Sequence, residues 1–479
     1  MSLAGLPHVG RRLGKAKRAQ HRGGLLGTLR FALPTWLLLV SGAAFALGPT
    51  GVALPDFSVQ STLRTELNAP KPVFPLYQRH KRIHGLKPFQ ELVDAAPAGS
   101  VLRPPPGNYA GPVTLSKPLT IDGGGKVTID AGDRGSVFTI STDGATLRGV
   151  RLTGSGDVHD TEDACLEVRG HRNVVENLAI DNCLFGIDLR QANQNTLRNN
   201  RISSKPVELG VRGDGLRLWY SMNNLVEGNS LIDSRDFVVW YSNGNIIRNN
   251  LGRRSRYSMH FMFAQSNLVE GNRYYDNAVG IYVMYTDGVI IRNNLISHAN
   301  GATGMGIGFK EASNTVVEGN DIIYCGTGIG SDLSPYEPDT KIWIRNNRIA
   351  YNGIGILFNN ERIGNIVTDN VFEGNLTQVA VNGAGTAKGN IWRGNWWDDY
   401  QGFDRNGDGR GDSAYDIYAY ADRIWMERPH ALFFKNAPLM EALDFLERLA
   451  PFSSPTLILR DAQPRFTKPA RHGTSRTPS

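Results

Sequence analysis

Two methionines and one histidine stand at matching places in two neighbouring segments, "RYSMHFMFA" and "IYVMYT". Met262 and Met284 each lie ten residues before an asparagine, and His260 lies two positions before Met262. Thioether sulfur and imidazole nitrogen bind soft metals, and Cu(I) accepts methionine ligands that zinc, calcium or magnesium refuse. The three side chains therefore predict a copper site if the fold brings them to one surface. If a one-residue bulge turns them inward, they are packing residues instead.

Two tryptophans occupy the same register in the preceding segments, "LRLWYS" and "FVVWYS". Trp219 and Trp240 align with Met262 and Met284, which predicts one continuous stripe. Large apolar groups displayed together on a surface indicate a binding face. Packing inside the protein is the alternative for the tryptophans too.

The loop "DRNGDGRGD" places acidic or amide side chains at every second position. Asp404, Asn406, Asp408 and Asp412 could surround a hard cation such as Ca²⁺, and the glycines permit a tight turn. The twelfth position is Tyr415 rather than glutamate, so the loop is not a complete EF-hand loop. A plain acidic turn is the alternative to a calcium site.

A second polar cluster lies in "GSGDVHDTEDA". It groups His159, Asp160, Glu162 and Asp163 within one turn. A hydrogen-bonded turn is the simple interpretation. A secondary metal site at His159 and Asp160, or acid–base chemistry, is the functional one.

A repeat must position all of these residues. Short Val/Ile-rich runs each end at an asparagine, at intervals of 21 to 29 residues, and these asparagines are Asn177, Asn200, Asn229, Asn250, Asn272, Asn294, Asn320, Asn347, Asn370 and Asn395. This period predicts an all-β fold, a right-handed parallel β-helix, in which equivalent residues of successive coils stack. Each asparagine is expected to adopt the left-handed turn conformation and to bond with its neighbours in the stack. The frame of leucine-rich repeats is missing.

Alternation along one strand of each coil predicts which side chains face outward. Leu218, Val239, Phe261 and Val283 share one parity, which is apolar throughout and should face the core. The other parity contains Arg217, His260 and Lys310, so it should face outward together with the tryptophans and methionines.

Both ends of such a solenoid need covers, because an open coil exposes unpaired strand edges. "LKPFQELVDAA" predicts an amphipathic helix before the first strands, and "PLMEALDFLERLAPF" predicts another after the last coil, beginning near Pro438. We therefore expect a β-helix domain with helical caps over residues 86–452. Residues 48–85 are expected to form a linker, and residues 453–479 a disordered basic tail.

The first 30 residues carry seven basic residues and no acidic one, which equals the net charge of +7 of the whole chain. An apolar run, "FALPTWLLLVSGAAFALG", follows. Residues 1–47 therefore predict a signal peptide, with an inner-membrane anchor as the alternative, and an exported protein. The remaining chain is neutral, which argues against nucleic acid as a partner.

The chain has three cysteines and no C-x-x-C pair. Sparse, odd-numbered cysteines predict small buried residues rather than a disulfide framework. Cys183 and Cys325 fall in similar places six coils apart, so about 29 Å should separate them and exclude a bond.

The chain resembles the family of nitrous oxide reductase maturation proteins called NosD. The resemblance rests on "LVDAAPAGSVLRPPPGNYAGPVTLSKPLTIDG", "TDGATLRGVRLTGSGDVHDTEDA", the "RYSMHFMFA" and "VMYT" pair, "GNWWDDYQGFDRNGDGRGDSAYD" and "DRIWMERPHALFFKNAP", and it spans roughly residues 86–450. The flanking stretches are more specific than the coil repeat. The coils of Trp219 and Trp240 depart from what the family leads us to expect, which leaves room for another client.

The resemblance implies a non-catalytic periplasmic accessory protein. Partners implied for the family are an ABC transporter with membrane and ATPase subunits, a copper chaperone, and nitrous oxide reductase, whose copper–sulfide centre is assembled with their help. Copper on His260, Met262 and Met284 agrees with that role. The alternative function is a carbohydrate-active β-helix, that is a polysaccharide lyase, epimerase or hydrolase, which would need paired carboxylates or a basic residue in an exposed groove.

Overall fold

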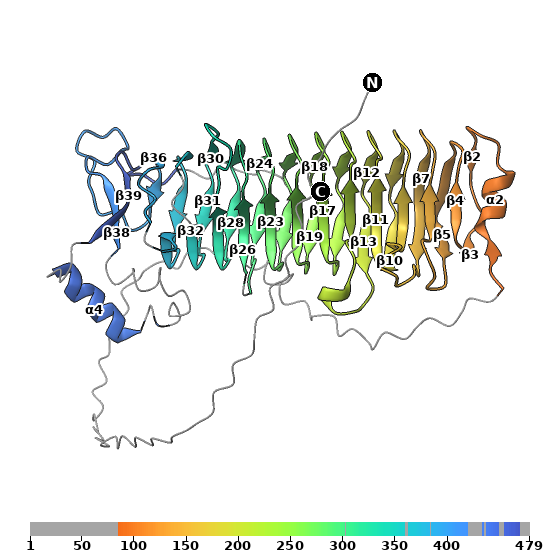
Figure 1. Cartoon of the computed structure of the whole chain (residues 1–479), viewed down its shortest axis with the longest axis horizontal. Coiled ribbons are helices and arrows are strands. Elements are labelled where there is room, and N and C mark those ends of the chain that lie inside the picture. The colour runs from red at the N-terminus through yellow and green to blue at the C-terminus, as the bar shows by residue number, and fades with distance from the viewer. Residues whose placement is uncertain are drawn as a thin grey trace, which may run out of the picture. The chain divides into compact units, whose positions relative to one another are not determined.

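The computed structural model describes residues 85–301, 303–359, 363–383, 385–419, 434, 437–449 and 455–469, and shows a solenoid of stacked β-coils (Figure 1). The predicted signal peptide and the predicted linker up to residue 84 lie outside the described residues. No helix in the described residues combines the length and the apolar character that crossing a bilayer requires.

Each coil of the repeat region consists of three short strands that pair in parallel with the equivalent strands of the neighbouring coils. The third strands form a 12-stranded sheet. Its members are β4 (Val113–Leu115), β6 (Phe138–Ile140), β8 (Ala164–Val168), β11 (Phe185–Arg190), β14 (Leu216–Trp219), β17 (Asp236–Trp240), β20 (Tyr257–Met262), β23 (Val279–Met284), β26 (Met305–Lys310), β29 (Thr327–Asp332), β32 (Ile354–Phe358) and β35 (Thr377–Val381).

The first and second strands of the coils form a 25-stranded sheet. Its members are β1 (Lys87–Pro88), β2 (Val101–Leu102), β3 (Gly107–Ala110), β5 (Thr120–Asp130), β7 (Thr146–Thr153), β9 (Val174–Glu176), β10 (Ala179–Cys183), β12 (Thr196–Arg198), β13 (Arg201–Ser204), β15 (Leu225–Glu227), β16 (Ser230–Ile232), β18 (Ile246–Arg248), β19 (Leu251–Arg253), β21 (Leu268–Glu270), β22 (Arg273–Tyr275), β24 (Ile290–Arg292), β25 (Leu295–Ser297), β27 (Thr315–Glu318), β28 (Asp321–Ile323), β30 (Ile342–Arg345), β31 (Arg348–Ala350), β33 (Asn365–Thr368), β34 (Val371–Glu373), β36 (Ile391–Arg393) and β37 (Trp396–Trp397). The predicted right-handed parallel β-helix is confirmed.

A ladder of buried asparagines sets the register of the coils. From Asn200 to Asn395 each side-chain Nδ2 donates to the Oδ1 of the next asparagine at 2.9–3.0 Å. The residue before each ladder asparagine makes the left-handed turn, as Asn199 (φ 55°) and Gly228 (φ 65°) do. We predicted that one asparagine both makes the left-handed turn and forms the ladder hydrogen bond. In the structure the turn is made by the preceding residue, because the amide of the ladder asparagine must point inward. Asn177, with φ 56°, belongs to the turn positions and not to the ladder.

The predicted core parity is confirmed. Leu218, Val239, Phe261 and Val283 are all fully buried. They lie on four adjacent strands in direct register. Apolar side chains from both sheets fill the interior along the coils.

The N-terminal cover is the predicted helix, α2 (Phe89–Ala95). Phe89 and Val93 are buried, and Leu92 and Ala96 pack against the same core. The ring of Phe89 meets that of Tyr109 edge to face at 5.3 Å. Burial of this apolar side covers the first coils, as the sequence predicts.

The C-terminal cover differs from the prediction. Helix α4 (Pro438–Leu449) begins at the predicted proline, but its apolar side chains Leu439 and Leu446 remain 71% and 52% exposed. A two-stranded ribbon of β38 (Tyr415–Ala419) and β39 (Thr456–Asp461) packs into the core instead, with Ile458 and Leu459 fully buried. β39 lies in the stretch that we expected to be a disordered tail, and residues 470–479 lie outside the described residues.

Asp461 explains why this ribbon can end the solenoid. Its buried carboxylate accepts hydrogen bonds from the Asn395 backbone N–H and Nδ2, both at 3.0 Å, and from Trp397 Nε1 at 3.3 Å. The Asp461 carboxylate thus takes the place of the side-chain oxygen that the next asparagine of the ladder would supply. Donors of the last coil that would otherwise be buried without partners are satisfied in this way.

The prediction that the cysteines are buried residues without disulfides is wrong in part. Cys165 in β8 and Cys183 in β10 form a disulfide, with their Cα atoms 5.6 Å apart. Cys325 is buried and free, so the predicted absence of a bond between Cys183 and Cys325 is confirmed. Alignment of repeats could not reveal the disulfide, because its two cysteines lie on different sheets.

Candidate metal site on the central coils

The stripe of tryptophans and methionines lies on the outer side of the 12-stranded sheet. Trp219, Trp240, Met262 and Met284 are direct register partners on β14, β17, β20 and β23. All four are half-buried, whereas the alternate residues of these strands fill the core. The predicted outward parity therefore holds.

β20 contains the type of bulge that could have reversed this parity. Asp236 pairs with Tyr257 and Val238 with His260, so β20 has one extra residue at this point. The bulge lies before His260, and the strand from His260 onward stays in register with both neighbours. Bulges often occur beside functional sites, where they re-aim side chains.

His260 and Met284 meet directly across β20 and β23. The Nε2 atom of His260 lies 3.1 Å from the Sδ atom of Met284. Met262 is the register partner of Met284 on the adjacent strand. The imidazole and the Met284 thioether thus meet on the outer side of the sheet, and Met262 stands in register beside Met284.

His260 points outward but is covered by aromatic rings, so only 8% of it is exposed. Its ring stacks on Tyr257 at 4.9 Å and meets Trp240 edge to face at 5.7 Å. Burial lowers the pKa of His260 to about 4, and the nearby Asp236 carboxylate offsets only part of this effect. The imidazole is therefore neutral at ordinary pH, which is the state that binds a metal.

The donor set fits a soft monovalent metal. The other ring nitrogen of His260, Nδ1, is buried and has no hydrogen-bond partner among the described residues. Nε2 and the sulfur of Met284 would supply two contacts, and Met262 a third. Hard cations need oxygen ligands, and the described residues contain no cluster of three or more His, Cys, Asp or Glu that could hold a metal ion.

A second aromatic column, which the sequence analysis does not predict, lies next to the stripe. Tyr220, Tyr241, Phe263 and Tyr285 follow the stripe residues directly, and their rings stack at 4.8, 5.2 and 5.0 Å. The repeated pairs "WY", "WY", "MF" and "MY" were the available signal. Each of these four residues has a positive φ of 48–51°, so they form the turn after the third strand.

An ion-pair network lies on the same outer surface, toward the N-terminus. Arg217 binds Asp188 through Nε at 2.9 Å and Nη2 at 2.8 Å, and Glu162 through Nη1 at 2.6 Å. Arg190 contacts Glu162 at 2.6 Å and Glu167 at 3.3 Å. Each of these carboxylates is therefore neutralised by arginine, which leaves a poor general acid or base.

Each residue of the predicted secondary site around His159 has contacts of its own. Glu162 belongs to the ion-pair network, and the Asp163 carboxylate accepts hydrogen bonds from the Val158 backbone N–H and the Thr161 hydroxyl. His159 and Asp160 are exposed, and His159 Nε2 lies 3.1 Å from the Val211 carbonyl oxygen. These contacts agree with the hydrogen-bonded turn, and metal binding at His159 and Asp160 stays a prediction.

The acidic loop folds around its own backbone. Asp404 accepts hydrogen bonds from the N–H groups of Gly407 and Gly409, both at 2.8 Å, and Asp408 accepts from Arg410 N–H at 2.8 Å. Asp412 accepts from Arg405 N–H at 2.8 Å, and Asn406 from Asp408 N–H at 3.0 Å. Calcium binding by Asp404, Asn406, Asp408 and Asp412 stays a prediction.

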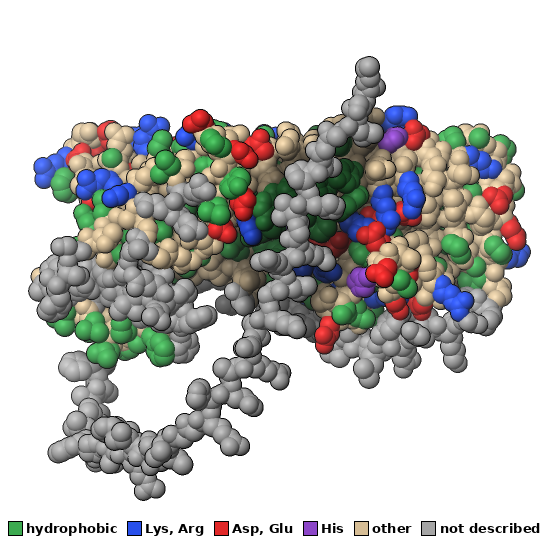
Figure 2. Space-filling view, viewed as in Figure 1, with side chains coloured by type: hydrophobic (Ala, Val, Ile, Leu, Met, Phe, Trp, Pro, Cys, Tyr) green, Lys and Arg blue, Asp and Glu red, His purple; other side chains and the backbone are tan. Residues whose placement is uncertain are grey.

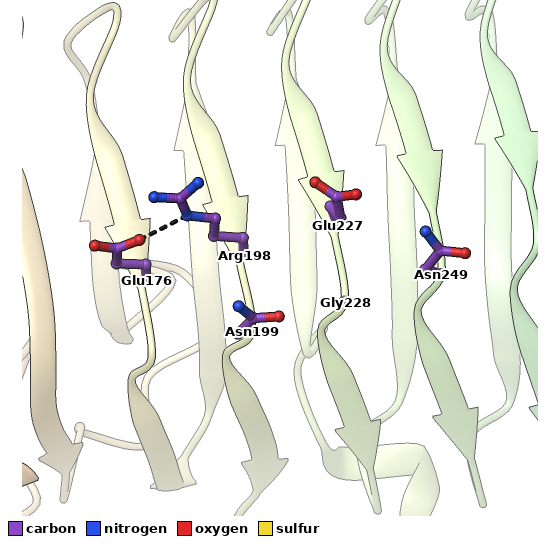
Figure 3. Close-up of a pocket in the computed structure, with 6 residues that line it drawn as sticks. All are labelled: Glu176, Arg198, Asn199, Glu227, Gly228 and Asn249. Atoms are coloured by element: carbon purple, nitrogen blue, oxygen red, sulfur yellow. Dashed lines mark hydrogen bonds and ion pairs between the residues drawn. The ribbon is translucent and has the colours of Figure 1, made fainter. Parts of the chain in front are cut away.

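A pocket on the first strands of the coils has a structural explanation (Figure 3). It is lined by Glu176, Arg198, Asn199, Glu227, Gly228 and Asn249. Arg198 turns toward Glu176, at 2.6 Å, and Glu227 pairs with Arg248 of the next coil at 2.9 Å. A Cβ atom at Gly228 would lie 2.5 Å from Asn199 Oδ1. Glycine at this position therefore avoids a clash with the Asn199 side chain of the preceding coil. The pocket is the gap between two ion pairs of an alternating charge ladder.

Comparisons with known proteins point to one family. Residues 205–402 match the family model described as periplasmic copper-binding protein (NosD). A probable ABC transporter binding protein NosD of Pseudomonas aeruginosa is 27% identical over 397 residues, which cover 76% of this chain and 87% of that protein. The protein of the same description from Stutzerimonas stutzeri is 35% identical over 109 residues, which cover 22% of this chain and 25% of its own.

Several solved structures match this chain at low similarity. The A-module of the mannuronan C-5 epimerase AlgE6 of Azotobacter vinelandii matches 63% of this chain and 93% of its own, with 16% identity and a TM-score of 0.44. An alginate lyase from Paenibacillus sp. matches 61% and 96%, with 16% identity and a TM-score of 0.37. Similarity at this level carries no argument about substrate or catalysis.

Proposed function

We propose, from the premise that this chain belongs to the NosD family, that it is a periplasmic accessory protein that binds copper and works with an ABC transporter. The finer proposal is that it holds Cu(I) transiently on His260, Met262 and Met284. It then presents the ion to nitrous oxide reductase during maturation of that enzyme, to which a copper chaperone also contributes. The chain itself would catalyse no reaction.

The observation that carries the proposal is the 3.1 Å approach of His260 Nε2 to Met284 Sδ, with Met262 in register beside them. The histidine is neutral at periplasmic pH because burial lowers its pKa to about 4, so no proton competes for its nitrogen. Thioether ligation at a half-buried surface is weak and exchangeable, which suits an ion that must be passed on.

The arrangement of charges supports a binding role rather than a catalytic one. The buried carboxylates of the outer surface, Asp188 and Glu167, are held by Arg217 and Arg190. A sugar-cleaving enzyme needs a carboxylic acid and a base free to exchange protons with the substrate. The central coils display tryptophan, methionine and aromatic side chains instead.

Copper binding by the purified exported chain tests the site. Affinity for Cu(I) is measured by competition with a coloured Cu(I) chelator, for the wild type and for the triple variant His260→Gln, Met262→Leu and Met284→Leu. The leucines keep the side-chain volume while removing sulfur, and we expect a loss of affinity of at least about 10-fold.

Met259→Leu is the matched control. Met259 lies one residue before His260 on the same strand but is fully buried in the core, so its replacement should leave Cu(I) affinity unchanged. Equal affinity of the wild type and the triple variant would remove the site assignment. It would leave the family membership intact.

A further inference from the structure

Eight residues on four adjacent coils form one apolar surface, which we call the aromatic–methionine face. Each coil contributes two consecutive residues, and the eight are Trp219, Tyr220, Trp240, Tyr241, Met262, Phe263, Met284 and Tyr285. Figure 2 shows hydrophobic side chains gathered in a hollow in the middle of the visible surface, over the central coils, with charged side chains on both sides. Tyr220 and Phe263 are 43% and 44% exposed.

Turn geometry alone does not call for aromatic residues at this place. The equivalent turn positions of nearby coils hold Gln191 and Glu311, with φ of 52° and 49°. At the other left-handed turn the coils use asparagine and glycine, which adopt positive φ most easily. Four successive bulky rings in this conformation therefore need another reason, and display of the rings on a surface supplies one.

The arrangement has the anatomy of a protein–protein interface, an apolar centre with a charged rim. Arg217 and Arg190, with their carboxylate partners, border the face toward the N-terminus. Toward the C-terminus Lys310 lies in register with Met284, and its ammonium is 5.8 Å from the ring centre of Tyr285. Tryptophan, tyrosine and methionine are among the residues that such interface centres favour.

The packing of the rings indicates which class of molecule could bind to this face. Tyr241 stacks between Tyr220 and Phe263 with interplanar angles of 5° and 12°, so neighbouring rings cover each other's faces and present their edges to solvent. A sugar needs an open ring face, and a nucleic acid or an anionic membrane needs basic residues, which the face itself lacks. An apolar protein surface is the complement that remains.

We propose that the aromatic–methionine face is the docking surface for the protein that receives copper from His260, Met262 and Met284. The inference rests on the proposed function, and Met262 and Met284 belong to both the metal site and the face. A partner ligand that takes the ion must therefore approach across these rings. The partner would carry an apolar rim around its own copper ligands. The face spans four coils, about 14 Å along the solenoid, so the contact is small and short-lived, as ion exchange requires.

Transfer of copper to apo nitrous oxide reductase, the client in the proposed function, tests the inference. The variant is the full exported chain with Tyr241→Gln and Phe263→Gln, because glutamine already occupies the same turn at Gln191. Neither residue is a proposed ligand. We expect Cu(I) affinity against the chelator within 2-fold of the wild type, and a rate of transfer to the client at least 10-fold slower.

Ile246→Gln with Ile290→Gln is the matched control. Both isoleucines point outward from the first strands, each 39% exposed, away from the face, so transfer should proceed at the wild-type rate. A wild-type rate in the Tyr241 and Phe263 variant would overturn the inference, and so would a wild type that binds copper but does not transfer it. Absence of copper binding by the wild type would instead overturn the proposed function. If the double variant misfolds, Tyr220→Gln at the border of the face replaces it, with at least a 3-fold slower transfer expected and an unchanged rate overturning the inference.

Discussion

Two neighbouring regions of the same outer surface use the same structural positions in opposite ways. One column of the 12-stranded sheet runs Glu167, Asp188, Arg217, Val238 and His260 in direct register. At its N-terminal end, charged side chains pair with one another in a dense network. Two coils further on, His260 lies beside a thioether, and its Nδ1 has no partner among the described residues.

Under the proposed function, this difference separates groups that stabilise the fold from groups that bind copper. In the N-terminal region each buried charge has a partner, so the network holds the loop at residues 157–163 against the coils. In the central region Trp240 Nε1 and His260 Nδ1 are buried with no partner among the described residues, which costs stability. The central region thus lacks the mutual pairing of polar groups that stabilises the N-terminal region. The three predictions below test this division, from the largest expected effect to the smallest.

Arg217→Met should produce the largest change in the free energy of unfolding. It leaves the carboxylate of Asp188, which is fully buried, without the two hydrogen bonds at 2.9 and 2.8 Å. Removing one partner of a buried ion pair costs about 3–5 kcal/mol when the other charge stays uncompensated. Arg190 Nε still contacts Asp188 at 2.6 Å in this variant, so we expect a loss at the lower end of that range, about 3 kcal/mol. Urea unfolding followed by circular dichroism measures this loss.

Arg172→Met provides the comparison with an exposed ion pair. The ion pair of Arg172 with Asp143 is at 2.9 Å and exposed on both sides, so the unfolding midpoint should not move measurably. Copper affinity should stay the same in both variants if the two regions have separate roles. A loss of copper binding in Arg217→Met, with the fold intact, would contradict the division.

Asp214 lies between the two regions and should make stability depend on pH. Burial, with help from the nearby Asp236 carboxylate, raises the pKa of Asp214 to about 7. A carboxyl whose pKa is higher in the folded state contributes stability at low pH and loses it as the pH rises through 7. Asp214→Asn should therefore gain on the order of 2 kcal/mol relative to the wild type between pH 5 and pH 8.

Urea unfolding of both proteins at pH 5 and pH 8 gives this difference directly. His260 titrates in the same direction in both proteins, so its contribution cancels when they are compared. Its own sign is the opposite one, because its lowered pKa makes stability fall as the pH drops from 6.5 toward 4. An equal change with pH in wild type and variant would mean that Asp214 is ionised in the folded protein.

The sequence was sufficient for the solenoid and for the outward direction of the candidate ligands. The asparagine period aligns the coils, and strict alternation then assigns Met262 and Met284 to the outside once Phe261 and Val283 are assigned to the core. The bulge in β20 could have reversed the assignment, and only its position before His260 kept it correct.

Contacts between coils and between sheets could not be read in the same way. The burial of His260 depends on how Tyr257 and Trp240 orient their rings, which no repeat pattern specifies. Helix α4 has the periodicity of a cap, yet the acceptor that ends the ladder is Asp461, in a stretch with the composition of a disordered tail. Amphipathic pattern indicates that a helix forms, but it does not indicate which surface the helix covers.

The smallest expected effect concerns the rings themselves. Phe263 stacks between Tyr241 and Tyr285 at 5.2 and 5.0 Å, and each contact contributes about 1 kcal/mol at most because the ring is 44% exposed. Phe263 also has a φ of 51°, a conformation that asparagine adopts more easily by roughly 1 kcal/mol. In Phe263→Asn the two terms nearly cancel, so the free energy of unfolding should change by less than about 1 kcal/mol.

Phe261→Ala sets the scale for this measurement. Phe261 lies two residues before Phe263, on β20, and is fully buried, so its truncation should cost about 3–5 kcal/mol. A loss above about 2 kcal/mol in Phe263→Asn would place the stacked rings among the residues that hold the coils together. The central region would then resemble the ion-pair network in its role, and the case for a docking surface would lose its main support. A near-zero change would mean that the rings are dispensable for folding, which is the expected behaviour of residues retained for a partner.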